Sequence, residues 1–255
     1  MSTPTINQIY QHASVRKYKP DPVPHSMVEE IVAASQRSST SSNLQIWTVV
    51  AVTTESKRAR LMEICNNQKH ILQAPLFLTW CADISRLDRI CQLLGYQFDP
   101  AYVENFLVSA MDATIAMQTA ALAAESMGLG MCYIGAIRNN PLEAVELLEL
   151  PELVFPVCGM TVGWPDETPF KKPRLPLEAV LHWESYGVND EETLLRQYDQ
   201  EMFDTGIYGN DLVPVQDREG ETCNFSWMER SARKVSKPVR ANTRKDAKEQ
   251  GFELL

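Results

Sequence analysis

The sequence predicts an α+β fold, and two observations carry this prediction. Four runs rich in β-branched and aromatic residues have the length of β-strands, and several longer segments have helical character. This count of elements fits either an α+β or an α/β protein, but the helices and strands do not alternate as regular βαβ units require. We therefore expect a sheet surrounded by helices.

The four predicted strands are short runs whose side chains are mainly apolar. They are WTVVAVTT at 47–54, FLTWCAD at 77–83, CYIGA at 132–136 and VCGMTVGW at 157–164. Helices are predicted at 55–65, 103–127, 141–149 and about 192–203. Gly135 falls inside one of these strands, where glycine is unfavourable unless another group approaches the backbone closely.

Two more helices are predicted to begin near residues 5 and 26. Thr5 precedes Gln8 by three residues, and Ser26 precedes Glu29 by three, which is the spacing of a capping box. The second of these helices extends to about Arg37.

The segment between these helices, HASVR at 12–16, alternates polar with apolar residues. In an extended chain this pattern puts His12, Ser14 and Arg16 on one face. Three groups able to form hydrogen bonds thus converge there.

The predicted helix at 103–127 is apolar around most of its circumference. It also carries Glu104, Asp112, Gln118 and Glu125, and Gly128 follows it as a typical helix end. We expect the fold or a partner subunit to bury this helix, and we expect no membrane span.

The character of the chain changes after about residue 190. Residues 205–225 form a long excursion, and residues 228–249 carry many lysines and arginines, which is typical of a solvated helix face or tail. We therefore divide the chain into a domain at 1–190 and a C-terminal extension at 191–255 that packs on the same domain.

The composition of the chain indicates which classes of partner and which cellular compartment to expect. A net charge of −9 and a pI near 5.0 argue against nucleic acids and anionic membranes as partners. The six cysteines lack the spacing of zinc sites or disulfide scaffolds, and the amino terminus lacks the apolar run of a signal peptide. We expect a cytoplasmic protein whose partners are small molecules or a second copy.

No motif for a metal, a nucleotide loop or a catalytic triad is present, and the four histidines are dispersed. Several cationic and polar segments remain as candidates, namely HASVR, SSTSSNLQ at 38–45, NQKH at 67–70, GLGMCYIGA at 128–136 and KKPRLP at 171–176. Lysine and arginine in KKPRLP suit a phosphate, although that motif taken alone favours a solvated loop. SSTSSNLQ fits either a polar ligand or a plain loop.

Taken together and in order, these segments resemble the nitroreductase family, specifically its NADPH-dependent subgroup of major oxygen-insensitive nitroreductases and NADPH–flavin oxidoreductases. The resemblance covers about residues 3–186. Its most specific pieces are HASVR, STSSNLQ, NNQKH, AAESMGLGMCYIGAIRN and GWPDETPFKKPRLP.

The resemblance implies a homodimer with a mainly antiparallel sheet and one FMN in each of two pockets at the subunit interface. It places His12, Lys172 and Arg174 near the FMN phosphate, with help from Ser14, and Arg16 at the pyrimidine edge of the flavin. The flavin carries the chemistry, so no catalytic side chain and no metal is expected. The implied cofactor contacts are His12, Ala13, Ser14, Val15, Arg16, Thr40, Ser41, Ser42, Gln45, Gln68, Lys69, His70, Tyr133, Ile134, Gly135, Ala136, Lys172, Pro173 and Arg174.

The implied activity is ping-pong transfer of two electrons from NADPH, or NADH, through FMN to nitroaromatics, quinones or free flavins. A permanently charged Arg16 beside the pyrimidine ring favours the reduced flavin. A flavin-binding or flavin-supplying protein with incidental reductase activity is the alternative.

Two positions depart from the family pattern. Ala136 stands where relatives often have a second glycine. In the 205–225 excursion only Arg218, between Asp217 and Glu219, is available for the 2′-phosphate of NADPH, and Arg230 beyond it is a second candidate.

Overall fold

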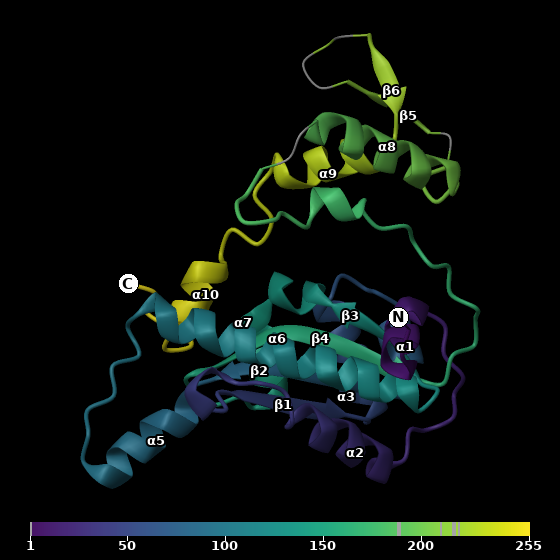
Figure 1. Cartoon of the computed structure of the whole chain (residues 1–255). Helices are drawn as coiled ribbons and strands as arrows, with labels where there is room; N and C mark the ends of the chain where they lie inside the picture. The colour runs from purple at the N-terminus through teal and green to yellow at the C-terminus, as the bar shows by residue number, and fades with distance from the viewer. Residues whose placement is uncertain (1, 188–189, 210, 216–217, 219) are drawn as a thin grey trace. The chain divides into compact units, whose positions relative to one another are not determined.

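The computed structural model describes residues 2–187, 190–209, 211–215, 218 and 220–255 (Figure 1). The chain forms two compact units, and each is described by itself. Unit 1 comprises Met1–Pro169 and Arg240–Leu255, and unit 2 is Phe170–Val239. The sequence predicts a division near residue 190. The contacts instead divide the chain after residue 169, and residues 240–255 belong to unit 1.

Unit 1 is built on a four-stranded sheet in which every pair of neighbours is antiparallel, as expected. Its strands, in the order β1-β2-β4-β3, are β1 (Trp47–Val52), β2 (Leu76–Asp83), β3 (Gly130–Ile134) and β4 (Val154–Gly163). The four predicted strands are therefore confirmed. The prediction that β3 includes Gly135 and Ala136 is wrong, because the backbone bends at Ile134 and enters the 3₁₀ helix η2 (Gly135–Asn139).

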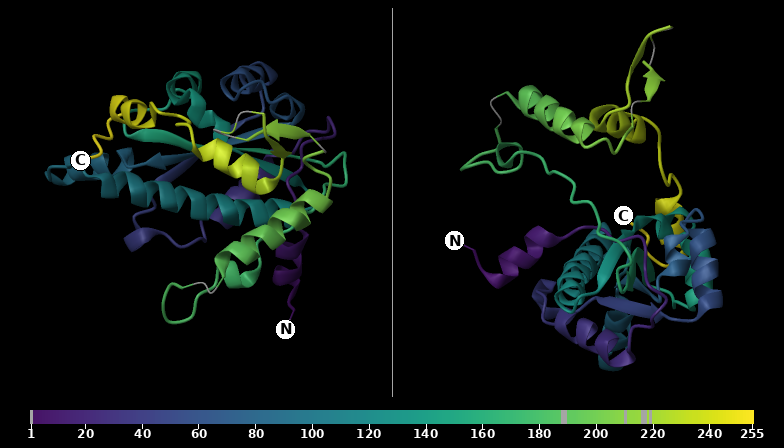
Figure 2. Two further views of the ribbon diagram at one scale, coloured as in Figure 1. Left: turned by 90° about the horizontal axis from the view of Figure 1, so that it is seen from above. Right: turned by 90° about the vertical axis from the view of Figure 1, so that its right-hand side faces the viewer.

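Helices cover both faces of this sheet, so unit 1 has three layers (Figures 1 and 2). Alternate residues of β2 face opposite layers: Leu78 and Trp80 belong to the cluster with α2 and α6, whereas Phe77 belongs to the cluster with α3, α4 and α7. The helices of these layers are α2 (His25–Ser35), α3 (Glu55–Ile64), α4 (His70–Gln73), α6 (Val103–Ser126) and α7 (Pro141–Leu148).

Three further helices complete unit 1. They are α1 (Pro4–Gln11), α5 (Ser85–Leu94) and α10 (Thr243–Glu249). Helix α1 has no buried residue and projects from the body of the unit (Figure 2). The end of the chain packs into the core, because Phe252 is fully buried and meets Phe106 edge to face at 5.2 Å.

The first two helices lie where the sequence places them, but the predicted caps are wrong. Thr3, not Thr5, caps α1 by accepting from the N–H of Ile6, since Pro4 suits the first helical position. Pro24 precedes α2 and offers no side-chain acceptor, so the pair Ser26 and Glu29 forms no capping box.

Helix α6 is buried on one side only. The side toward the sheet carries buried alanines together with Ser109 and Asp112. Val103, Leu107, Met111 and Ile115, spaced four residues apart, are 44–51% exposed and form an apolar stripe on the other side. By length and composition α6 could cross a membrane, but its packing across all four strands identifies it as the central helix of unit 1. Gly128 follows it with a φ of +81°, as predicted.

Unit 2 contains one hairpin and short helices. Its elements are η3 (Leu177–Ala179), α8 (Glu191–Asp204), β5 (Leu212–Pro214), β6 (Thr222–Asn224) and α9 (Trp227–Val235). The predicted excursion thus holds an antiparallel hairpin, and α9 packs on α8 through Trp227 and Tyr198. The basic stretch at 228–249 is divided between α9 in unit 2 and α10 in unit 1.

Candidate functional site

The segment His12–Arg16 lies extended beside β3. The N–H of Val15 donates to the carbonyl of Met131 at 2.9 Å. The side chain of Val15 is buried against Gly130, where an added Cβ would stand 2.5 Å from Cγ2 of Val15. As the alternation predicts, Val15 faces the core, while the side chains of the polar residues on either side of it stay partly or fully exposed.

The far end of this segment is fixed by Glu167 and Tyr18. Oε1 of Glu167 accepts from the N–H of Arg16 at 2.6 Å and from that of Lys17 at 3.1 Å. The Tyr18 hydroxyl donates to the carbonyl of Val15 at 2.7 Å, and burial raises its pKa. Both polar backbone groups of Val15 are thus occupied, so the side chains of His12, Ser14 and Arg16 are what the segment offers to a ligand.

The near end is fixed by a side-chain pair. Nδ1 of His12 lies 2.5 Å from Oε1 of Glu125, near the end of α6. The Glu125 side chain is only 9% exposed, whereas that of His12 is 28% exposed. Helix α6 therefore orients the His12 ring through the carboxylate of Glu125.

The NNQKH segment approaches the same place. His70 begins α4, and its pKa is lowered by burial and, secondarily, by the positive charge of Arg16. Nε2 of His70 is buried and forms no hydrogen bond with any residue that the structure describes. Gln68 donates to the carbonyl of Cys65 at 3.0 Å, and Lys69 is exposed. Arg16 and His70 are thus brought together from distant parts of the sequence.

The end of β3 adds backbone donors to this region. Tyr133 donates from its hydroxyl to Oε1 of Gln118 at 2.8 Å, and burial raises its pKa. Gly135 and Ala136 open η2, and the N–H groups of a helix's first turn have no partner within the helix. The nearest atoms to a Cβ at Gly135 would be those of the Arg138 guanidinium, the first at 3.4 Å, which is ordinary van der Waals contact.

The loop at 40–45 is anchored elsewhere on α6. Asp112, 2% exposed, accepts from the Thr40 hydroxyl and from the N–H of Ser41. Ser42 and Gln45 both have positive φ values, 48° and 54°, which are uncommon for residues other than glycine. The carboxylate of Asp112 holds this strained loop in place.

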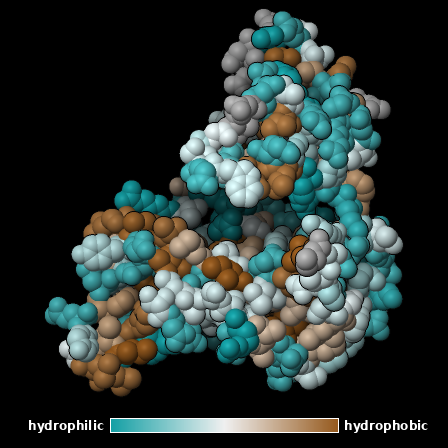
Figure 3. Space-filling view, viewed as in Figure 1, coloured by the Kyte–Doolittle hydropathy of each residue, from teal (hydrophilic) through white to brown (hydrophobic). Residues whose placement is uncertain are grey.

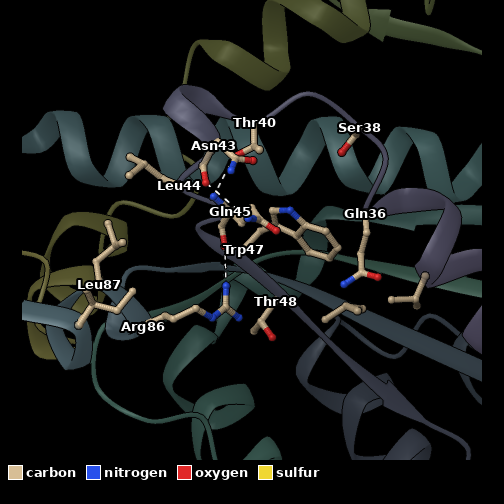
Figure 4. Close-up of a pocket in the computed structure, with 13 residues that line it drawn as sticks. Gln36, Ser38, Thr40, Asn43, Leu44, Gln45, Trp47, Thr48, Arg86 and Leu87 are labelled. Atoms are coloured by element: carbon tan, nitrogen blue, oxygen red, sulfur yellow. Dashed lines mark hydrogen bonds between the residues drawn. The ribbon is translucent and has the colours of Figure 1, made fainter. Parts of the chain in front are cut away.

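A groove of about 710 Å³ adjoins the loop (Figure 4). Thr40 and Gln45 line it together with Trp47 of β1 and Arg86 of α5, and Nη1 of Arg86 donates to the carbonyl of Gln45 at 2.5 Å. The predicted residues from the His12, His70 and Tyr133 segments do not line this groove.

The site residues of unit 1 therefore form two groups, each fixed to α6 by one buried carboxylate. Asp112 holds the 40–45 loop and Glu125 holds His12. Thirteen residues separate them, which at about 1.5 Å per residue is about 20 Å along the helix.

The remaining predicted residues belong to unit 2. Nη1 of Arg174 donates to the carbonyls of Lys172 at 2.9 Å and Pro173 at 3.1 Å, and the Tyr198 hydroxyl donates to Pro173 at 3.2 Å. Both basic side chains are exposed. This bonding fixes the KPR backbone locally.

Of the two candidates for the nicotinamide phosphate, Arg218 already has an acidic partner. It forms an exposed ion pair with Glu221 at 3.3 Å. Arg230 is exposed on α9. Asp217 and Glu219, which flank Arg218 in the sequence, lie outside the described residues.

Three acidic residues that organise the site were not predicted from sequence: Asp112, Glu125 and Glu167. The first two had a signal, because each is an acid within an otherwise apolar helix. Among the described residues no group of three histidine, cysteine or acidic side chains is arranged to hold a metal ion.

Comparison with known proteins identifies relatives over most of the chain. Residues 9–164 match the Nitroreductase family, and residues 172–255 match the Nitroreductase family, C-terminal domain. An FMN reductase [NAD(P)H] of Bacillus subtilis is 42% identical over 200 residues, covering 77% of this chain and 80% of the relative. The oxygen-insensitive NADPH nitroreductase of Salmonella typhimurium is 39% identical, over 78% of this chain and 81% of its own.

Solved structures agree with this result. NfrA2 of B. megaterium matches with a TM-score of 0.90 and 36% identity, over 100% of both chains. The NADPH:FMN oxidoreductase from Vibrio harveyi, complexed with NAD+, matches with a TM-score of 0.86 and 31% identity, over 98% of each chain.

Proposed function

The chain belongs to the nitroreductase family, and on that premise we propose how its residues hold FMN and serve electron transfer from NADPH. It is an FMN-dependent oxidoreductase whose oxidants are nitroaromatics and flavins. Quinones are further candidates. FMN, when bound, supplies the redox chemistry by taking two electrons from the nicotinamide and passing them to the oxidant.

The described residues fit this cofactor. Next to β3 they combine a partly exposed His12 and an exposed Arg16, and β3 leads into the first turn of η2. His70 contributes a buried ring nitrogen that lacks a protein partner. Donors and cations of this kind match the carbonyl oxygens, ring nitrogens and phosphate of FMN.

We assign each segment one part of FMN. His12, Lys172 and Arg174 bind the phosphate, with help from Ser14, and Arg16 lies at the pyrimidine edge, where it stabilises the reduced flavin. The backbone from Tyr133 to Ala136 runs beside the ring. The remaining ring and ribityl contacts come from Thr40, Ser41, Ser42, Gln45 and Gln68.

The protein acts as a homodimer in this proposal. The 40–45 loop and His12 are anchored about 20 Å apart on α6, so one protomer cannot easily bring both to a single FMN. A second copy resolves this, because each pocket then joins the His12 segment of one protomer to the loop of the other.

The surface of unit 1 supports such an interface. The apolar stripe of α6 is exposed, and α5 with the adjoining turn exposes Leu93, Leu94 and Tyr96 at 69–83%. Figure 3 shows hydrophobic residues gathered over α5 and the adjoining end of α6. Exposed apolar patches of this kind are typical of protein interfaces.

The observation that carries the proposal is that the His12–Arg16 segment lies against β3, which leads directly into η2, and that Arg16 lies near His70. The test is anaerobic stopped-flow mixing of the purified protein with NADPH and with NADH. We expect the yellow flavin absorbance to bleach within the turnover time, faster with NADPH. Flavin that stays oxidised with both nicotinamides would reject the reductase function.

The alternative, a flavin-carrying protein, predicts weak and reversible FMN binding with negligible turnover. The same titration separates the two, because a carrier releases FMN on dialysis and does not reduce nitro compounds. None of the six cysteines forms a disulfide and four of them are buried, which is consistent with the cytoplasm that we propose for the enzyme.

The phosphate assignment predicts the behaviour of Lys172→Ala combined with Arg174→Ala. Loss of two charge-assisted bonds should weaken FMN binding by about a hundredfold or more, because each such bond contributes about 1.5–3 kcal/mol and about 1.4 kcal/mol corresponds to a factor of ten. The FMN remaining after dialysis measures this effect. Full retention by the double variant would show that the KKPRLP segment does not bind the phosphate.

A further inference from the structure

His12 and Glu125 meet although 113 positions separate them in the chain. The side chain of Glu125 is nine-tenths buried, and its Oε1 lies 2.5 Å from Nδ1 of His12. Its other oxygen, Oε2, is buried as well and accepts no hydrogen bond from any residue that the structure describes.

This arrangement is unfavourable for the fold alone. Burial removes water from the carboxylate, and an oxygen without a hydrogen bond leaves part of this desolvation free energy uncompensated. Asp112 on the same helix differs, because both of its oxygens accept hydrogen bonds. An apolar residue at 125 would fit the rest of α6 without this penalty, so the benefit of Glu125 lies in its effect on His12.

The carboxylate determines what His12 can offer to an anion. In a neutral imidazole only one of the two nitrogens carries a proton. If that nitrogen is Nδ1, it donates to Oε1 of Glu125. Nε2 would then be an acceptor and would repel a phosphate oxygen. The imidazolium has an N–H on both nitrogens and can donate from each of them. Only this form donates to Glu125 and to a phosphate at once.

We propose that Glu125 is a positioning residue for the FMN phosphate. Its carboxylate orients the His12 ring by accepting from Nδ1, so that in the FMN complex Nε2 is directed at the phosphate and can donate a charged hydrogen bond to it. The inference rests on the proposed function, because it takes the FMN phosphate as the anion that meets His12.

The groups around the pair do not compete for this contact. Tyr133 of β3 is a titratable neighbour of Glu125, but its hydroxyl donates to Gln118. Arg16 is on the same segment as His12, and its positive charge acts on His70 and Tyr18.

The test compares two flavins that differ only in the phosphate. Glu125→Gln keeps the shape of the side chain and an acceptor for Nδ1 but removes the charge. We expect FMN to bind the variant about tenfold more weakly, as loss of a hydrogen bond to a charged group predicts, and riboflavin to bind it as it binds the unsubstituted protein. Glu104→Gln, an exposed change on the same helix, should alter neither affinity.

A second variant tests whether the effect passes through His12. His12→Ala should weaken FMN binding to a similar degree. Adding Glu125→Gln to His12→Ala should weaken FMN binding little further, because the two residues act on the same hydrogen bond. Independent, additive losses would overturn the proposal.

Nitrogen NMR of the FMN complex, with labelled histidine, gives a readout that does not depend on activity. Both ring nitrogens of His12 should be protonated in the unsubstituted protein and only one in Glu125→Gln. A single protonated nitrogen in the unsubstituted complex would overturn the proposal.

The affinities also separate this inference from the proposed function. Equal weakening of FMN and riboflavin by Glu125→Gln, or no weakening of either, rejects the role of Glu125 while FMN binding itself stands. An unsubstituted protein that binds neither flavin rejects the proposed function and this inference with it.

Discussion

Gly130 is the residue that lets the His12–Arg16 segment lie against the sheet. A Cβ there would stand 2.5 Å from Cγ2 and 2.8 Å from Cβ of Val15, closer than real side chains approach. The position requires glycine because the Cβ atom of any other residue would push Val15 away from β3.

We therefore expect Gly130→Ala to lower the free energy of unfolding by about 1–3 kcal/mol, as overpacking does, and to weaken FMN binding. Val15→Ala removes Cγ1 and Cγ2 but keeps the Cβ at 2.8 Å, so the double variant should recover part of both losses. Chemical denaturation and FMN titration measure them. Gly187→Ala, where an added Cβ has no neighbour within 4 Å, serves as the control. A double variant worse than the sum of the single ones would refute the explanation.

Arg16 and His12 lie at opposite ends of the same short segment and should act on different properties of the flavin. Arg16→Ala should lower the two-electron reduction potential by about 30–60 mV, because about 30 mV corresponds to 1.4 kcal/mol and a charged hydrogen bond contributes about 1.5–3 kcal/mol. His12→Ala should mainly reduce FMN occupancy. Potentiometry and flavin content of the purified variants distinguish them, and equal effects on both quantities would reject the division.

At the scale of elements, α6 connects the sheet to both groups of site residues. Its apolar residues pack on the strands, while Asp112 and Glu125 reach the 40–45 loop and His12. The helix is therefore a scaffold whose position determines where both segments lie.

Asp112→Asn should loosen the loop more than the fold. The asparagine amide keeps one acceptor oxygen but has an NH₂ group in place of the other. It can therefore accept from the Thr40 hydroxyl or from the N–H of Ser41, but not from both. We expect faster amide hydrogen exchange over residues 40–45 than in the unsubstituted protein, with β2 and β4 unchanged. Exchange that rises throughout the sheet would mean that Asp112 supports the core instead.

The elements were predictable where the signal is local. Strands β1, β2 and β4 and helices α3, α6, α7 and α8 lie close to their predicted ranges, because each is a long run with a consistent pattern. The caps of α1 and α2 were not predictable, since a proline beside each start decides the cap. The acids Asp112 and Glu167 act on residues at least 70 positions away, and such distances leave no spacing in the sequence.

At the scale of the whole molecule, the exposed stripe of α6 predicts that the enzyme depends on self-association. Leu107→Glu with Ile115→Glu places two charges on this stripe and should shift sedimentation toward the monomer. FMN content should fall in parallel, because each pocket would lose the partner's loop. A stable dimer of this variant, with normal flavin content, would place the interface elsewhere.

The division of the chain into units could not be read from composition. The basic stretch at 228–249 looks uniform, yet it spans the boundary at residue 240. What returns the last residues to unit 1 is packing: Phe252 contacts Phe106, and the N–H of Leu153 donates to the carbonyl of Gln250 at 2.8 Å. Neither contact is visible without the fold.

Unit 1 is formed from residues that precede and follow residues 170–239 in the sequence, so the hydrophobic core of unit 1 cannot be completed until the segment at 240–255 has been made. The ribosome delivers α6 and the whole sheet first, but Phe252, which is fully buried, comes after all of unit 2 in the sequence. The growing chain must therefore keep an unfilled hydrophobic surface around Phe106 and Phe155 while residues 170–239 are made. A ribosome that stops after β4 but before residue 252 yields all the strands of unit 1 and no finished core.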